Sequence, residues 1–453
     1  MSDVLQHVIY AIFRVGERLG APLTAASRTG GPRGDPRSEL RSQAYDVAHA
    51  ARCWRARRMR LAPGAVDRVG AELTATERLG PADSLDAVLP EGWTDGNAVR
   101  LLARNSEDQA RRLALIAGAS RSIVCAFWCI RDDAVGHAFV AALAARVRDG
   151  VDVVVVLDAN VLDRFAWIEQ SYGAFVTSFA AQGVPLVALR PAQPWLNTHR
   201  KLFAVDGEVA IVGGRNIGVP YATDGEGTFL DTDLEISGPG ALAVHHLVDR
   251  LAGRPLTELP MPPAAGPARV AVVDQPAGLD PVDDAVVRAL VQAVVHARAS
   301  VEIAFGYVIL PGALERALVQ AAARGVAVRV LTNSRATNDY PYWEGAAFAS
   351  IDALVRAGVP LFLMREQTLH AKFAVVDGRV CTVGSHNLWT LSTLHDAETN
   401  LVVDDPEIAE ALVALFDELV GQADRVEPDG WQVPDNRSLR LANALIWAWE
   451  GRG

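Results

Sequence analysis

The chain has 453 residues, of which 50% are hydrophobic and 7% aromatic, as is typical of a globular protein with two or three domains. Its net charge of −11 argues against an extended nucleic-acid-binding surface, which is usually basic, so a nucleic acid is not an expected partner. No apolar run reaches the roughly 18 residues of a membrane-spanning helix, and the N-terminal residues lack the pattern of a signal peptide. We therefore expect a cytoplasmic location, with any membrane contact peripheral and at the inner face.

The two ends of the chain stand apart from the rest in pattern. Residues 1–94 are predicted to form a helical and irregular region of unassigned role, and residues 426–453 an amphipathic tail. Two segments space apolar residues at helical intervals, Val4–Leu19 and Ser438–Gly451. One interpretation is that each packs against the protein's own core, and the other is contact with a lipid interface. The arginine-rich segment Ala51–Arg60 is interpreted as a solvated helix, with a lipid or nucleic-acid contact as the alternative.

The middle of the chain contains an internal repeat. A strand, an amphipathic helix, a glycine turn and a valine-rich strand are predicted within residues 122–160 and again within residues 300–334. Strands as apolar as VDVVVVLDA, in the first copy, indicate a sheet that helices cover on both faces. The sequence thus predicts an α/β protein with one domain over residues 95–252, a proline-rich linker over 253–269 and a second domain over 270–425.

The most informative feature of the repeat is the position of lysine. The chain has 43 lysine and arginine residues, yet only Lys201 and Lys372 are lysines. They lie in HRKLFAVDGEVAIVGGRN (His199–Asn216) and HAKFAVVDGRVCTVGSHN (His370–Asn387), which align with each other without gaps. Both segments read H-x-K-x4-D-x6-G-[GS]-x-N. A chain that otherwise uses arginine and keeps lysine only here indicates sites that need a compact ammonium group.

Two copies of one half-site predict a single pocket at a pseudo-twofold interface, and such a pocket suits a phosphodiester. Lys201 and Lys372 can stabilise the negative charge that grows on the non-bridging oxygens during attack. One imidazole, of His199 or His370, can attack phosphorus to give a phosphohistidine. The other can donate a proton to the departing alkoxide and then deprotonate the incoming alcohol or water. On an extended strand, the histidine and lysine of each motif would project from the same face.

The amides and glycines of the motifs can support this chemistry. Asn216 and Asn387 carry NH2 groups that can donate hydrogen bonds to the phosphate oxygens. The glycines near the end of each motif permit a close approach of the backbone; they are Gly213, Gly214 and Gly384.

The acidic residues of the repeat have two expected roles. Each histidine needs a carboxylate on its other ring nitrogen, and the candidates are Asp231 and Glu398, which occupy equivalent positions downstream of the two motifs. Asp206 and Asp377, each followed by glycine, are expected to turn the chain and cap a strand end, with direct chemistry as the alternative. In the second copy, Ser385 adds a hydroxyl group that could contact the substrate.

These motifs resemble the double H-x-K-x4-D motif of the phospholipase D superfamily. Within it, NTHRKLFAVDGEVAIVGGRNIGVPY is similar to the first motif of bacterial cardiolipin synthases, and TNSRATND followed by LHAKFAVVDG is similar to their second half. The resemblance covers about residues 95–425. It implies two fused phospholipase-D-like α-β-α sandwich domains, related by pseudo-twofold symmetry, that share one active site without a metal or cofactor.

The resemblance also implies roles for individual residues. It makes His199 the nucleophile and His370 the general acid and base, and it pairs each histidine with the acid of the opposite copy, Glu398 and Asp231 respectively. The sequence departs from the family pattern at Gly214, where serine is usual, and residues 1–94 lack the paired transmembrane helices of some cardiolipin synthases.

The predicted function is therefore transfer of a phosphatidyl group, through a covalent phosphohistidine, from a phosphatidylglycerol-like phospholipid to an acceptor alcohol such as the glycerol head of phosphatidylglycerol. Water as the acceptor would make the protein a phospholipase D. The alternatives are a phospholipase D hydrolase, another phosphodiesterase such as a nuclease or a toxin lipase, and a non-catalytic lipid-binding scaffold. The acidic charge disfavours a nuclease, and the intact motifs in both copies disfavour a scaffold.

Overall fold

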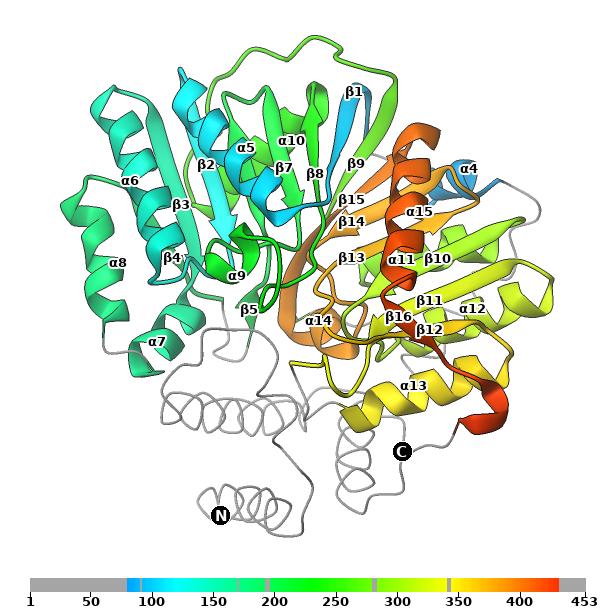
Figure 1. Cartoon of the computed structure of the whole chain (residues 1–453). Coiled ribbons are helices and arrows are strands. Elements are labelled where there is room, and N and C mark those ends of the chain that lie inside the picture. The colour runs from blue at the N-terminus through cyan, green and yellow to red at the C-terminus, as the bar shows by residue number, and fades with distance from the viewer. Residues whose placement is uncertain are drawn as a thin grey trace, which may run out of the picture.

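Two halves with a similar order of strands and helices lie side by side in the computed structural model of the chain (Figure 1). The structure describes residues 80–89, 92–168, 171–191, 196–278, 283–339 and 344–431. Both segments with helical apolar spacing near the chain ends, and the arginine-rich segment Ala51–Arg60, lie outside the described residues.

The first half alternates strands and helices. Its elements are β1 (Trp93–Leu102), α5 (Asn105–Gly118), β2 (Ser122–Phe127), α6 (Ala134–Arg148), β3 (Asp152–Asp158), α7 (Ala159–Ile168), α8 (Tyr172–Ala181), β4 (Leu186–Leu189), β5 (Asn197–Thr198), β6 (Leu202–Val205), β7 (Val209–Gly213), α9 (Val219–Ala222), β8 (Asp233–Ser237) and α10 (Pro239–Leu251).

The second half follows a similar order after a proline-rich connection, with one helix in place of α7 and α8, no equivalent of β5 among the described residues, and an additional last strand. Its elements are β9 (Ala268–Gln275), α11 (Ala285–Val295), β10 (Ser300–Phe305), α12 (Gly312–Ala323), β11 (Ala327–Asn333), α13 (Glu344–Arg356), β12 (Leu361–Met364), β13 (Lys372–Val376), β14 (Val380–Gly384), α14 (Thr390–His395), β15 (Asp396–Asp404), α15 (Pro406–Val420), β16 (Ala423–Arg425) and a 3-10 turn (Pro428–Gly430).

One mixed sheet runs through both halves, in the order β16-β12-β11-β10-β13-β14-β15-β9-β1-β8-β7-β6-β2-β3-β4. Its centre is the antiparallel pair of β1 and β9, in which Trp93 lies opposite Ala271. Outward from this pair, β8, β7, β6, β2, β3 and β4 correspond in order to β15, β14, β13, β10, β11 and β12. The strand order therefore gives the halves a pseudo-twofold relation, and the predicted α/β fold with two fused halves is confirmed.

Helices cover both faces of the sheet because successive strand residues point to opposite faces and both sets are apolar. In β2, Val124 and Ala126 belong to a cluster with α10 and α15, whereas Ile123, Cys125 and Phe127 pack with α5, α6 and α8. The α10 and α15 layer spans the two halves, since their residues belong to one continuous buried cluster. The valine-rich strands thus have the two-sided burial that their composition predicts.

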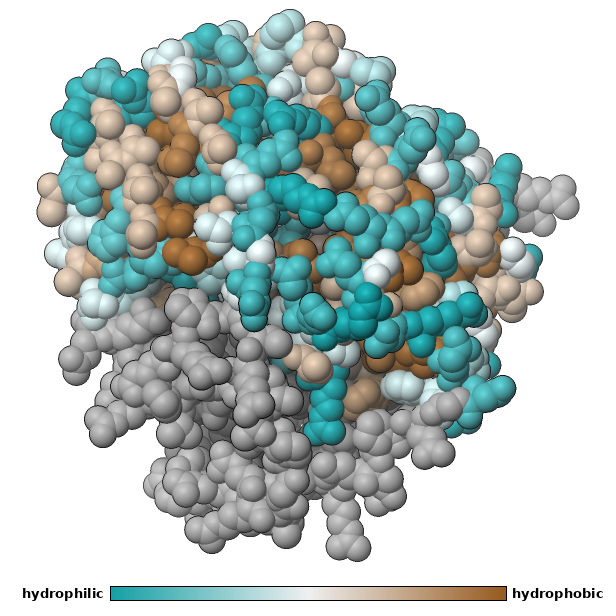
Figure 2. Space-filling view, viewed as in Figure 1, coloured by the Kyte–Doolittle hydropathy of each residue, from teal (hydrophilic) through white to brown (hydrophobic). Residues whose placement is uncertain are grey.

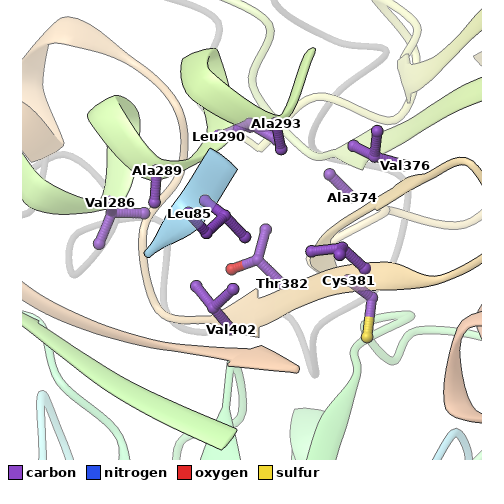
Figure 3. Close-up of a pocket in the computed structure, with 11 residues that line it drawn as sticks. Leu85, Val286, Ala289, Leu290, Ala293, Ala374, Val376, Cys381, Thr382 and Val402 are labelled. Carbon is purple, nitrogen blue, oxygen red and sulfur yellow. The ribbon is translucent and has the colours of Figure 1, made fainter. Parts of the chain in front are cut away.

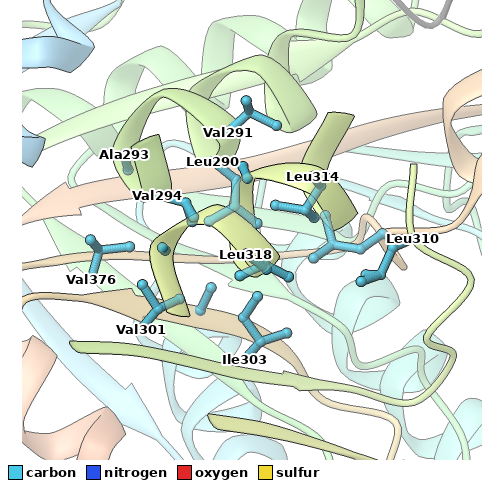
Figure 4. Close-up of a cluster of buried hydrophobic side chains, with 14 of the residues drawn as sticks. Leu290, Val291, Ala293, Val294, Val301, Ile303, Leu310, Leu314, Leu318 and Val376 are labelled. Carbon is cyan, nitrogen blue, oxygen red and sulfur yellow. The ribbon is translucent and has the colours of Figure 1, made fainter. Parts of the chain in front are cut away.

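The other face of the second half is covered by α11, α12 and α13. Figure 4 shows side chains of α11 and α12, among them Leu290, Val294 and Leu318, packed over Val301 and Ile303 of β10. A short helix that precedes the repeat, α4 (Pro81–Leu85), joins the same cluster and contacts α11. Part of the region predicted to lie outside the repeat therefore completes the core of the second half.

A small pocket lies between α4, α11 and strands β13 to β15 (Figure 3). Its lining is almost wholly apolar, with Leu85 and Leu290 on one side and Ala374 and Val402 on the other. The histidines and lysines of the motifs are not among its lining residues. The pocket is therefore part of the packing of the second half.

Over the described part of the face in Figure 2, small clusters of hydrophobic residues are scattered among hydrophilic ones. The large hydrophobic side chains that are clearly exposed among the described residues, Leu256 and Met261, lie in the connection between the halves. Within the same residues, no helix combines the length and the apolar character that crossing a membrane requires.

Candidate active site

The two motifs meet because each half pairs its histidine segment with the other half. In the first motif, β5 pairs in parallel with β15, and the N–H of His199 donates to the carbonyl of Ala397 (2.8 Å). In the second, the N–H groups of His370 and Ala371 donate to the carbonyl of Leu230 (2.7 and 2.8 Å). Each histidine therefore lies beside the residue that precedes the acid of the opposite half.

His199 is oriented by Glu398. Its Nδ1 lies 3.1 Å from both carboxylate oxygens of Glu398, and its ring meets the edge of Trp128 at a centroid distance of 5.7 Å. Since Nδ1 carries the proton donated to the carboxylate, Nε2 is left as the unprotonated nitrogen of the neutral ring. Burial lowers the pKa of His199 to about 4, against the opposing charge of Glu398, so the ring is neutral at physiological pH.

His370 is oriented by Asp231 in the same manner. Its Nδ1 lies 2.6 Å from Oδ2 of Asp231, and its ring packs against Tyr221 and Phe229 with centroid distances of 5.4 and 5.2 Å. Burial and the charge of Lys372 lower the pKa of His370 to about 4. The structure thus contains the crossed pairing of acids and histidines that the family resemblance implies.

The carboxylates remain ionised in these surroundings. Burial alone would raise the pKa of Glu398, but the charge and hydrogen bond of His199, with the charges of His386 and Lys201, hold it at about 2. Burial likewise opposes ionisation of Asp231, yet the positive charges and hydrogen bonds beside it lower its pKa. Each acid therefore acts as a hydrogen-bond acceptor that fixes the tautomer of its histidine.

Both lysines are fully buried, and each is anchored to the backbone of its own motif. The ammonium group of Lys201 donates to the carbonyl of His199 (2.6 Å), and that of Lys372 donates to the carbonyl of His370. Burial lowers the pKa of Lys201 to about 7 and also lowers that of Lys372. The charge of each lysine acts on the histidine of the other half, so the two half-sites form one electrostatic unit.

The histidine and lysine of the first motif precede a strand and do not form part of one. We expected both on an extended strand, but β6 begins at Leu202, because Asn197 and Thr198 pair with β15 of the other half. In the second motif, β13 begins at Lys372 itself. The segment that carries each histidine thus hydrogen-bonds to the other half before the following strand begins.

The two asparagines lie in the site with different partners. The side-chain oxygen of Asn216 accepts from the N–H of Cys129 (3.2 Å), and its amide donates to the hydroxyl of Tyr221 (3.3 Å). The side-chain oxygen of Asn387 is buried without a hydrogen-bond partner among the described residues. Both residues are nearly inaccessible to solvent, at 3% and 4% exposure.

The motif glycines are required by close approach to the acids and their neighbours. A Cβ at Gly214 would lie 2.1 Å from Oδ1 of Asp231, and one at Gly213 would lie 2.0 Å from Oδ1 of Asp233. Gly384 of the second half faces Asn400 in the same way, at 2.3 Å. A side chain at any of these positions would displace the segment that carries the acid or its neighbour.

Ser385 directs its hydroxyl to the backbone. It donates to the carbonyl of Thr399 (3.3 Å) and accepts from the N–H of the same residue (3.0 Å), and it is fully buried. The hydroxyl that Ser385 adds in the second copy is therefore bonded to the backbone of β15, next to Glu398 in the sequence.

Asp206 and Asp377 fill the turn position at the end of a strand. Both adopt a left-handed conformation with φ of 54°, which aspartate tolerates better than most residues. The carboxylate of Asp206 accepts from the N–H groups of Ser120, Arg121 and Ser122 at 2.8 to 2.9 Å. That of Asp377 accepts in the same way from residues 298–300. These contacts favour the structural role that we expected over direct chemistry.

Other residues around the site were not predicted from the sequence. Ser392 donates to Oε1 of Glu398 (2.6 Å), Trp128 faces His199, and Arg200 makes a two-point ion pair with Asp274 of β9 (2.6 and 2.8 Å). Arg200 lies between the histidine and the lysine of the first motif, so its place in the sequence could have indicated that it belongs to the site. Ser392 and Trp128 have no counterpart of the same type in the other copy, so the repeat gave no signal for them.

The comparison with protein families identifies the same two regions of the chain. The family model "Cardiolipin synthase, PLD-like domain" matches residues 113–225 and 290–420, so each half contains one match and together they include both motifs.

Curated relatives extend the similarity over most of the chain. Cardiolipin synthase A of Pseudomonas aeruginosa is 29% identical over 364 residues, which cover 77% of this chain and 71% of the relative. Cardiolipin synthase A of Pseudomonas putida is 30% identical over 351 residues, covering 74% and 71%. The major cardiolipin synthase of Bacillus subtilis is 27% identical over 345 residues, covering 72% and 69%.

A solved structure shares the fold. The crystal structure of phosphatidylserine synthase from Haemophilus influenzae matches with a TM-score of 0.64 and 15% sequence identity, over 82% of this chain and 98% of that one. At this identity the similarity concerns the arrangement of the two halves and their sheet.

Proposed function

This chain belongs to the cardiolipin synthase family of the phospholipase D superfamily, and we propose that it transfers a phosphatidyl group between phospholipids through a phosphohistidine. The observation that carries the proposal is the pair of neutral histidines whose Nδ1 atoms are bound to buried carboxylates. This arrangement leaves Nε2 of each ring for the substrate. One histidine can then act as nucleophile while the other moves a proton.

In the first step, Nε2 of His199 attacks phosphorus of the donor lipid, and a P–N bond forms as the P–O bond to the leaving alcohol breaks. His370, which takes up a proton on Nε2 when the anionic substrate offsets the charges of the lysines, gives that proton to the departing oxygen. Lys201 and Lys372 stabilise the added charge on the non-bridging oxygens. This electrostatic stabilisation is stronger in a buried site than in water. The amide groups of the motif asparagines can donate to the same oxygens.

In the second step, the acceptor hydroxyl loses its proton to Nε2 of His370, and its oxygen attacks phosphorus as the P–N bond breaks. His199 returns to its neutral form and His370 to its protonated form. We propose the glycerol head of phosphatidylglycerol as the acceptor, by analogy with the relatives named cardiolipin synthase. A phospholipid donor also requires peripheral contact with a membrane surface.

The direct test is incubation of the protein with phosphatidylglycerol vesicles in EDTA, with and without added glycerol, and analysis of lipid products by mass spectrometry. We expect cardiolipin without added metal, and loss of this product in His199→Ala and in His370→Ala with the fold retained. Phosphatidic acid as sole product would instead identify a hydrolase. Full activity of either variant would contradict the two-histidine mechanism.

A further inference from the structure

The backbone that precedes His199 is held by the end of a neighbouring strand. Asp158 is the last residue of β3, and its buried carboxylate accepts from the N–H of Thr198 (2.6 Å), directly before His199. The second oxygen of Asp158 accepts from the N–H of Val161 (2.8 Å), which fixes the carboxylate at the start of α7. His199 itself donates its N–H to Ala397, so the chain at this point is held from two sides.

The second half holds His370 in the equivalent way with a different residue type. Asn333 is the last residue of β11, and its side-chain oxygen accepts from the N–H of Leu369 (2.8 Å), directly before His370. Its amide donates to the carbonyl of Leu369 (2.8 Å) and to that of Gly306 (3.0 Å). The N–H of His370 is bound by Leu230, again from the opposite side.

We propose that Asp158 and Asn333 are positioning residues that set the aim of His199 and His370 through the backbone. The two side chains lie at the ends of equivalent strands and are 0% and 8% exposed. They share an oxygen that accepts one backbone N–H, whereas only Asn333 also donates from an amide. Both side chains therefore accept a hydrogen bond from the residue before a histidine. A small displacement of that histidine is costly, because the reaction depends on its alignment with the substrate.

Asp158 and Asn333 accept the same kind of backbone hydrogen bond but differ in side-chain chemistry. We therefore expect Asp158→Asn and Asn333→Asp to have unequal effects. Asp158→Asn retains one oxygen for the N–H of Thr198, but its NH2 takes the place of the oxygen that accepts from the N–H of Val161, so one donor faces one donor. Asn333→Asp would direct a carboxylate oxygen at the carbonyls of Leu369 and Gly306, where the amide now donates. An acceptor that faces two acceptors is destabilising, so this exchange should be the more damaging one.

Although the inference concerns the histidines of the proposed reaction, its test does not require turnover. Diethyl pyrocarbonate acylates neutral imidazoles, and peptide mass spectrometry gives the modification rate of each histidine separately. In Asp158→Ala we expect a several-fold change in the rate at His199 with His370 unchanged, and in Asn333→Ala the reverse. Asp158→Asn, which keeps the acceptor for Thr198, should lie closer to the wild type at His199 than Asp158→Ala does, and thermal unfolding reports whether each variant is folded.

Turnover of phosphatidylglycerol gives the second readout. If the lipid is a substrate, kcat of Asp158→Ala and of Asn333→Ala should fall by about 10- to 100-fold with little change in KM, and Asp158→Asn should fall less than Asp158→Ala. Equal changes at both histidines, or rates at the wild-type value in both alanine variants, would overturn the inference. An inactive wild type with the expected modification pattern would contradict the proposed function and leave the positioning role supported.

Discussion

Tyr221 and Ser392 stand at the same place in the two copies of the repeat and serve different members of the site. Ser392 donates to Glu398 (2.6 Å) and accepts from Nε1 of Trp389 (2.9 Å). Tyr221 packs against the ring of His370 and accepts from Asn216. Ser392 thus supports the pair of His199 and Glu398 through the carboxylate, whereas Tyr221 supports the pair of His370 and Asp231 through the imidazole.

This difference predicts unequal effects of removing the two hydroxyl groups. Ser392→Ala deletes a donor to the buried Glu398, so kcat should fall about tenfold, because a hydrogen bond to a charged group contributes roughly 1.5–3 kcal/mol. Tyr221→Phe keeps the ring that contacts His370 and is the matched control, with an expected change below about threefold. A larger loss in Tyr221→Phe than in Ser392→Ala would contradict this assignment of roles.

Anion binding should be coupled to proton uptake. Burial and the neighbouring lysines hold the pKa values of His199 and His370 at about 4, so both rings are neutral in the free protein at pH 7. A phosphate-like anion between the half-sites would offset the lysine charges and raise these values. Tungstate binding, measured by calorimetry in buffers of different ionisation enthalpy, should therefore take up a proton near pH 6.5.

The control for this coupling is His370→Ala, which lacks the proposed proton carrier. Its tungstate binding should show a smaller uptake than the wild type. Proton release on binding, or an affinity that does not change between pH 6 and 8, would exclude the predicted coupling.

The same pKa values predict a loss of stability in acid. Because the folded pKa of each catalytic-site histidine is depressed from 6.5 to about 4, the unfolded state binds more protons between these values. The stability contribution is present above pH 6.5 and is lost as pH falls to about 4, by roughly 3 kcal/mol per histidine. The midpoint of urea unfolding should decline over this interval.

His370→Ala should make this decline shallower. The matched control is His137→Ala, which removes a histidine whose side chain is 56% exposed and lies outside the site. An identical decline in wild type and His370→Ala would show that other groups determine the acid sensitivity.

Asp206 should matter for folding and little for the reaction. Asp206→Ala removes an acceptor of three backbone N–H groups and places alanine at a φ of 54°, so the free energy of unfolding should fall by about 2–4 kcal/mol. Folded protein should keep kcat within about threefold of the wild type, since alignment at His199 is set elsewhere. Asp206→Asn, which tolerates the turn conformation, should recover part of the stability.

Several features of the molecule could be predicted from its residues because the repeat encodes them twice. The gap-free alignment of the two motifs matched His199 with His370, and the apolar strands indicated a sheet covered on both faces. The family resemblance supplied the crossed pairing of Glu398 and Asp231, which the residues alone left open. The functional assignment from this resemblance agrees with the family to which the chain belongs.

Other features depend on contacts between distant segments and had no local signal. The pairing of β5 with β15 joins segments that lie far apart in the sequence, and it is the reason that the first histidine precedes its strand. Ser392 and Asp158 were not apparent because the other copy has Tyr221 and Asn333 at the equivalent places. Where the two halves have different residues at equivalent positions, the repeat does not reveal which residues belong to the site. Their hydrogen-bond partners are then found only from the three-dimensional structure.

The central pairing of β1 with β9 has a consequence for the ancestry and the assembly of the site. Cleavage between α10 and β9 would leave two fragments, each with a histidine, a lysine and a carboxylate that belongs to the other fragment's histidine. Two copies of the first fragment, joined through β1, could exchange Asp231 reciprocally and rebuild a symmetric site. The chain is therefore equivalent to a dimer with tethered subunits, and the tether is what permits its two subunits to carry different residues at equivalent positions.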